Sequence, residues 1–288
     1  MIFNMPKNNS DVNSKGLIKS GQIHNKEELI QYLSKKGNNH HNYRFYSKRE
    51  RIETILKDHT IYLSDGSNWN DTIDRENFND NPKEYKRFGL CFSFSKSESV
   101  AMWMLYSQND GCMIDYGQNL IKEILQTNTV QLGEFKNNVF QPKKIIERPQ
   151  FKISLFDIVY YGESKKDNSG YYVKRADEVH KSFNKEIIDE LSYQKKFVPW
   201  RYENECRLVV EVKSDICDFD EISCAAIEFN ENYIDKLKER TYDSPNSKSE
   251  KYNRSELRGQ INWNLCSECK KIYSKKRYRV IEKEPLRI

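Results

Sequence analysis

Hydrophobic and polar positions alternate with a period of two in several short segments, and each of these segments predicts a β-strand with a buried face. The clearest segment covers residues 205–212, where Cys206, Leu208, Val210 and Val212 fall on one side and Arg207, Val209 and Glu211 on the other. Further strands are predicted at 42–46, 61–64, 89–95, 111–116, 158–161 and 222–229.

Apolar positions spaced three and four residues apart predict helices between these strands. They occur at 27–33, 52–56, 120–125, 179–191 and 234–237. A further helix is predicted directly after Ser95, because Ser95 followed by Glu98 fits a capping box. Residues 136–150 carry Lys, Asn and Pro and are predicted to form a loop.

This mixture of short strands and helices predicts an α+β fold. We expect short, mostly antiparallel strands in two facing sheets, surrounded by helices and enclosing a central cleft. Residues 1–40 are expected to be a polar tail with a short helix, 41–240 the main domain, and 241–288 a linker with a basic C-terminal extension.

Composition limits the range of functions. The chain has 288 residues and a net charge of +5, a mild excess that permits a nucleic-acid partner without requiring one. No run is long enough to span a bilayer, and the N-terminus lacks the apolar core of a signal peptide, so we expect a cytoplasmic protein without a membrane partner. The seven cysteines agree with a reducing compartment.

The start of the clearest strand carries two acidic residues, Glu203 and Glu205. A strand conformation would point both side chains the same way, and adjacent carboxylates repel each other unless something compensates. The pair is therefore a candidate site. The alternative is a surface strand whose glutamates form salt bridges with Arg201 and Arg207.

Two earlier segments supply further candidates. Arg44 lies on the short aromatic strand at 42–46. Ser93 and Ser95 lie at a predicted strand-to-helix transition, with their hydroxyls on the same side.

In chain order, Arg44, Ser93-Phe94-Ser95 and Glu203-x-Glu205 resemble the Arg, Ser-Thr-Ser, Glu-x-Glu signature of the arginine-type ADP-ribosyltransferase superfamily. Phe94 departs from the usual Thr. A second resemblance covers about residues 41–230 and is to a widespread bacterial family with a domain of unknown function. The residues that carry it are Tyr43-Arg44, Cys91-Phe92-Ser93, Met102-Trp103 with Tyr106 and Gly111, and Trp200-x-Tyr202-Glu203-x-Glu205-x-Arg207.

The first resemblance implies an NAD-dependent ADP-ribosyltransferase that uses NAD as substrate and modifies a macromolecular acceptor, protein or nucleic acid. An intracellular toxin or defence effector is one such setting. Glu205 would stabilise the ribosyl cation and Glu203 would orient or deprotonate the acceptor. Arg44, Ser93, Ser95 and Tyr106 would bind NAD, with Arg44 on a phosphate.

Other interpretations stay open at this point. Trp103 and Tyr106 are three residues apart on a predicted helix and are either core anchors or a stacking surface for nicotinamide. The chain could instead be a non-catalytic module whose basic run at 274–279 contacts nucleic acid or protein, or an NAD glycohydrolase.

No metal site is predicted. Cys266 and Cys269 have the spacing of half a zinc site, but no second pair completes it, and a surface turn with two thiols is favoured. His40 and His41, beside the polar tail, are expected to be exposed.

Overall fold

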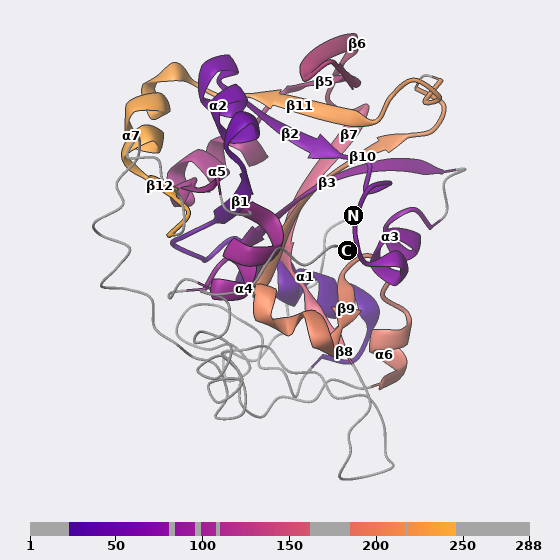
Figure 1. Ribbon diagram of the computed structural model, residues 1–288. Helices are drawn as coiled ribbons and strands as arrows, with labels where there is room; N and C mark the ends of the chain where they lie inside the picture. Colours follow the sequence, from indigo (N-terminus) through magenta and orange to yellow (C-terminus); the bar gives the residue numbers. More distant parts are fainter. Residues whose placement is uncertain are drawn as a thin grey trace.

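The computed structural model describes residues 23–80, 84–95, 99–107, 110–161, 185–216 and 218–245 (Figure 1). Of the predicted linker and basic extension at 241–288, the structure describes 241–245; Cys266, Cys269 and the basic run at 274–279 lie outside the described residues. Among the helices in the described ranges, none has the length and apolar character needed to cross a membrane.

Within the described residues, ten strands hydrogen-bond into one sheet, and every pairing among them is antiparallel. The main strand order is β12-β4-β1-β3-β2-β11-β5-β6, and β10 pairs with both β3 and β7. These strands are β1 (Arg44–Lys48), β2 (Thr60–Ser64), β3 (Tyr85–Ser93), β4 (Gly111–Asp115), β5 (Thr129–Lys136), β6 (Val139–Glu147), β7 (Phe151–Asp157), β10 (Glu205–Lys213), β11 (Cys224–Glu228) and β12 (Thr241–Asp243). A separate parallel pair is formed by β8 (Val159–Tyr161) and β9 (Lys195–Phe197).

The sheet divides at β3. One edge of this strand pairs with β10 along its whole length. The other edge meets β1 only at Ser93 and β2 only at Gly89, so two sets of strands diverge from it. The predicted α+β class with mostly antiparallel strands is confirmed, but the two predicted facing sheets are two branches of one hydrogen-bonded sheet.

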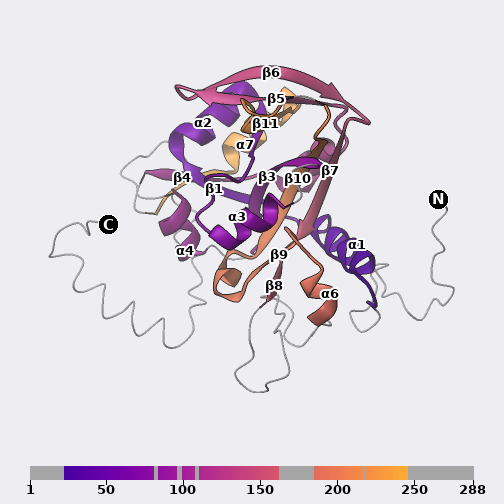
Figure 2. The same cartoon turned by 90° about the vertical axis from the view of Figure 1, so that its right-hand side faces the viewer.

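The helices are short and lie around the sheet (Figures 1 and 2). They are α1 (Lys26–Gly37), α2 (Arg49–Asp58), α3 (Thr72–Phe78), α4 (Val100–Met102), α5 (Gly117–Leu125), α6 (Lys185–Asp189) and α7 (Ile234–Glu239), with a π-helical turn η3 (Trp103–Ser107) and 3-10 turns η4 (Val198–Glu203) and η5 (Glu231–Tyr233). In α1, Leu29 and Leu33 are buried and the helix packs against β7. The segment predicted as a tail thus contributes a packed helix.

The alternation predicted for residues 205–212 is confirmed in β10. Cys206, Leu208 and Val210 face the main hydrophobic core, together with apolar residues of α2 and α5. Val209 faces a second core cluster on the other side. Both faces of β10 are therefore covered by protein.

The prediction of a loop at residues 136–150 is wrong, because β5 and β6 form a long hairpin there. Asn137 and Asn138 turn the chain with positive φ angles of 51° and 62°, a conformation that Asn tolerates better than most residues. Because β6 is the outer strand and most of its side chains are exposed, its sequence has the polar composition of a loop (Figure 2).

The helix predicted to begin at Ser95 starts later. Ser99 is the N-cap, and its hydroxyl accepts a hydrogen bond from the backbone N–H of Met102. After one turn the backbone widens into η3. Ser95 itself lies in irregular chain after β3, so the capping box centred on Ser95 is a wrong prediction.

Candidate functional site

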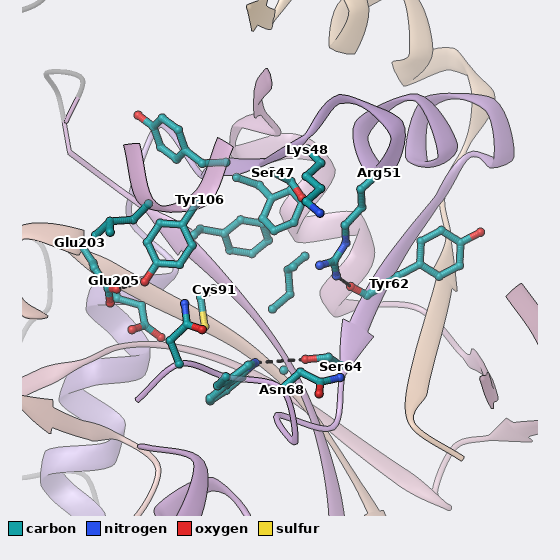
Figure 3. A pocket seen from close by; sticks show the side chains of 18 of the residues that line it. Ser47, Lys48, Arg51, Tyr62, Ser64, Asn68, Cys91, Tyr106, Glu203 and Glu205 are labelled. Carbon is teal, nitrogen blue, oxygen red and sulfur yellow. Dashed lines mark hydrogen bonds between the residues drawn. The ribbon is translucent and has the colours of Figure 1, made fainter. Parts of the chain in front are cut away.

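A cavity of about 770 Å³ opens on the face of the sheet that carries Cys91 of β3 and Glu205 of β10 (Figure 3). Residues from β1, β2, β3, α2, η3, β9 and η4 contribute to its lining. Its size is typical of a site for a small organic ligand.

At one end of this cavity lie Glu203 and Glu205 (Figure 3). The sequence predicted that the two residues share one extended strand, and this prediction is wrong. Glu203 ends η4, Glu205 begins β10, and Asn204 between them is left-handed with φ 45°. The two carboxylates nevertheless converge, because Lys196 Nζ donates to Glu203 Oε2 at 2.6 Å and to Glu205 Oε2 at 3.2 Å.

The pair belongs to a buried cluster of five charged groups. Arg207 binds both oxygens of Asp74, at 2.9 and 2.8 Å, and also donates to Glu205 Oε1 at 2.6 Å. Lys196 lies 3.5 Å from the Asp74 carboxylate. Three carboxylates thus face two cations, and none of the five side chains is more than 7% exposed. With every group ionised the cluster carries one excess negative charge.

The pKa values of the two glutamates are shifted in opposite directions. Burial, followed by the charge of Glu205, raises the pKa of Glu203 to about 7 against the opposing effect of Lys196. Burial also acts to raise the pKa of Glu205, but Arg207 and Lys196 outweigh it and lower that pKa to about 2. One carboxylate is therefore ionised at all physiological pH values, and the other exchanges a proton near neutrality.

Aromatic rings enclose the charged cluster. The hydroxyl of Tyr106, from η3, donates a short hydrogen bond to Glu203 Oε1. Lys196 lies 5.0 Å from the ring centre of Trp200, and the Arg207 guanidinium lies 4.6 Å from that of Trp69. Tyr106 thus lines the cavity, whereas Trp103 is buried against Tyr46 as a core anchor.

The other predicted site residues lie near the cluster but outside the cavity. The strand register places Arg44 opposite Ser93, and Ser93 opposite Glu205, in one row across β1, β3 and β10. Arg44 and Ser93 are buried at 8% and 1% exposure and do not line the cavity, nor does the half-buried Ser95. The three motif residues are therefore neighbours in the strand register, but Arg44, predicted to bind a phosphate of NAD, is not on the cavity wall.

The opposite end of the cavity is lined by two cationic residues, Lys48 and Arg51, which were not predicted from the sequence. Lys48 ends β1 and Arg51 lies in the first turn of α2, so both reach the cavity from the same corner (Figure 3). Arg51 donates to the carbonyl of Tyr62 at 3.4 Å and lies 5.2 Å from the ring centre of Phe45. Neither cation forms an ion pair with any carboxylate among the described residues.

Asp71, the N-cap of α3, is a further unselected residue on the cavity wall. Its Oδ1 accepts from the backbone N–H groups of Ile73 and Asp74. Its Oδ2 is buried and has no hydrogen-bond partner among the described residues. That oxygen is available to a donor on a ligand.

Sequence reasoning could not select Lys48, Arg51, Lys196 or Asp71, because each has the type and spacing of an ordinary surface residue. The alternative of a surface strand is wrong: Glu205 is 1% exposed, and its cationic partners are Arg207 and Lys196, whereas Arg201 is exposed.

Comparison of the chain with protein-family models, with curated proteins and with solved structures yields no match. The resemblances to the ADP-ribosyltransferase superfamily and to the bacterial domain family therefore stay predictions from motifs.

Proposed function

We propose that this cavity binds NAD as substrate and transfers its ADP-ribosyl group to a macromolecular acceptor. The observation that carries the proposal is the distribution of charge along one cavity. A buried cluster with excess negative charge occupies one end, and two cations without carboxylate partners among the described residues occupy the other.

This distribution suits a dinucleotide. Lys48 and Arg51 would bind the pyrophosphate, since guanidinium and ammonium groups form charge-assisted hydrogen bonds with phosphate oxygens. The ribose attached to nicotinamide would then lie at the acidic end, where Asp71 Oδ2 can accept from a hydroxyl. Lys48 and Arg51 take over the phosphate role that the sequence analysis gave to Arg44.

The chemistry at the acidic end follows from the charges. The bond between ribose C1′ and the nicotinamide nitrogen breaks, both electrons leave with neutral nicotinamide, and C1′ gains oxocarbenium character. Glu205 stays ionised and is fixed by Arg207, so its charge needs no reorganisation as the cation forms. Its Oε2 accepts from Lys196 at 3.2 Å, and a carboxylate oxygen can accept from a ribose hydroxyl as well.

Glu203 would act on the acceptor. A nucleophilic group of the acceptor gives an electron pair to C1′, and its proton passes to the Glu203 carboxylate. A base with a pKa of about 7 is suited to that task near neutral pH. Tyr106 and Lys196 hold the carboxylate in place from two sides.

The finer architecture and the setting belong to the same proposal. The divided sheet, with the cavity beside β3, is compatible with the split sheets of an ADP-ribosyltransferase fold. We propose a cytoplasmic toxin or defence effector as the setting. The free state of Cys91, Cys112, Cys206 and Cys224 agrees with a reducing compartment.

The test is Glu205→Gln. This change removes the fixed charge and leaves two carboxylates facing two cations, so the cluster is balanced and the fold should be retained. We expect nicotinamide release from NAD to fall by about a hundredfold or more, the usual cost of losing a main electrostatic stabiliser.

Glu211→Gln on the same strand is the matched control. Its carboxylate binds Arg87 and Tyr193 outside the cavity and should not affect release. Nicotinamide release that is undetectable in the unaltered protein, or equal in the unaltered protein and Glu205→Gln, would refute the proposal. Release without transfer to any acceptor would identify an NAD glycohydrolase instead.

A further inference from the structure

Three side chains with metal-binding atoms meet on the opposite face of β10 from Glu205. Cys206 follows Glu205 and therefore points the other way. Asp157 of β7 is its direct cross-strand partner, so both side chains share that face. His40, just after α1, completes the group. One ligand atom from each residue lies within 4.8 Å of the other two.

The surrounding structure holds these groups in position. The side chains of Asp157 and Cys206 are fully buried, whereas that of His40 is 15% exposed. The His40 ring stacks on Phe94 with 4.0 Å between ring centres and 2° between planes. His40 Nε2 lies 2.6 Å from Asp157 Oδ1. The prediction that His40 is exposed is wrong, because Phe94 and Asp157 cover its ring.

We propose that His40, Asp157 and Cys206 bind one divalent zinc-type metal ion. Imidazole nitrogen, carboxylate oxygen and thiolate sulfur are the three donors that zinc takes in proteins. The charges also balance, since the Cys206 thiolate and the Asp157 carboxylate cancel the two charges of the ion while His40 stays neutral. A neutral assembly avoids the cost of burying a net charge.

The bound ion would join three parts of the fold. It would connect the chain after α1 to β7 and to β10, one residue beyond Glu205. The site is therefore placed to fix the start of the strand that carries the proposed catalytic carboxylate. Without a metal, His40 and Asp157 form a hydrogen bond beside a thiol, and cobalt binding separates the two cases.

The experiment uses the full chain carrying Cys266→Ser and Cys269→Ser. These changes remove the Cys-x-x-Cys pair, which could bind the metal ion in place of the proposed site. Co²⁺ is titrated into the protein and its absorption is recorded. We expect one equivalent to bind, with a near-ultraviolet thiolate-to-cobalt band, and we expect Zn²⁺ to displace it. Binding without a thiolate band, or no binding, would overturn the proposal.

Single variants then locate the site. We expect three variants, His40→Ala, Asp157→Asn and Cys206→Ser, each to weaken Co²⁺ binding by at least about tenfold. Loss of a residue that only hydrogen-bonds to a metal ligand already lowers metal affinity by about that factor. Cys112→Ser is the matched control. Cys112 is an equally buried thiol that lies 3.6 Å from a carboxylate oxygen, Asp243 Oδ1, and it does not belong to the proposed metal site.

Unchanged affinity in His40→Ala would refute the site. That variant removes the most accessible ligand and leaves the buried ones, so it keeps the test decisive if Cys206→Ser fails to fold.

Discussion

Glu203 is the residue through which pH should act on the proposed reaction. Its pKa of about 7 belongs to a carboxyl group in contact with Lys196, Tyr106 and, through Lys196, Glu205. Only the ionised form can accept a proton from an acceptor. Transfer should therefore rise as pH increases through about 7, while NAD hydrolysis, which relies on Glu205, changes less.

Glu203→Gln should reduce transfer more than hydrolysis and should remove this pH dependence. Stability provides a second measurement. A carboxyl whose pKa is raised from its ordinary 4.5 to about 7 on folding contributes stability below pH 4.5, and that contribution is lost as pH rises through about 7. The melting temperature of Glu203→Gln relative to the unaltered protein should therefore increase between pH 4.5 and 7. Parallel curves would contradict the raised pKa.

Lys196 is the residue on which the charge cluster depends most. Lys196→Met would leave Asp74, Glu203 and Glu205 with Arg207 as their one remaining cationic partner among the described residues. Removing one partner from a buried ionic group costs about 3–5 kcal/mol, and we expect a loss of that size in the free energy of unfolding, measured with urea.

Lys195→Met, on the same strand, is the comparison for Lys196. Lys195 is more exposed and donates to backbone carbonyls of α6, so its replacement should cost much less. Equal losses from the two changes would show that the cluster adds no special stability.

Among the elements, the junction between η4 and β10 decides how the two glutamates meet. Asn204 has φ 45° and ψ 57°, so the backbone is left-handed at the point where an extended strand would continue. Asn204→Gly should fold and react normally, because Gly adopts this conformation without strain. Asn204→Val should cost about 1–2 kcal/mol of stability and should strongly reduce nicotinamide release. Full activity in Asn204→Val would show that the junction does not position the carboxylates.

At the scale of the whole molecule, NAD should stabilise the folded protein. A ligand at 100 times its dissociation constant adds about 2.7 kcal/mol, which corresponds to a rise in melting temperature of roughly 5–10 °C for a domain of this size. Arg51→Ala should reduce that rise, because it removes a cation from the cavity wall.

Arg44→Ala is the informative companion to this experiment. Arg44 is buried outside the cavity, so its replacement should lower the baseline melting temperature and preserve the response to NAD. The opposite outcome would be an unchanged melting temperature with NAD together with tight binding of DNA or RNA. If that binding weakens steeply with added salt and requires the basic run, the chain is a nucleic-acid-binding module. The basic residues of that run are Lys275, Lys276, Arg277 and Arg279.

The sequence by itself determined most of the elements. Period-two alternation of apolar residues located β10. Helical spacing located α2, α5 and α7, because each of these helices buries one face and the apolar positions of that face recur along the sequence. It failed where that signal is weak. The edge strand β6 is mostly exposed and therefore has the composition of a loop, and the turn before η3 is too short for a pattern.

The candidate site was determined by the sequence only in part. The motif order grouped Arg44, Ser93 and Glu205 into one predicted site. The strand register makes them neighbours across β1, β3 and β10, but Arg44 and Ser93 do not line the cavity. Only the tertiary structure decided which charges face the cavity. Lys196, Arg51 and Asp71 come from separate elements, and no spacing along the chain brings them together. Their proximity follows from how β3 divides the sheet and from which side each helix packs, a long-range outcome that local pattern does not encode.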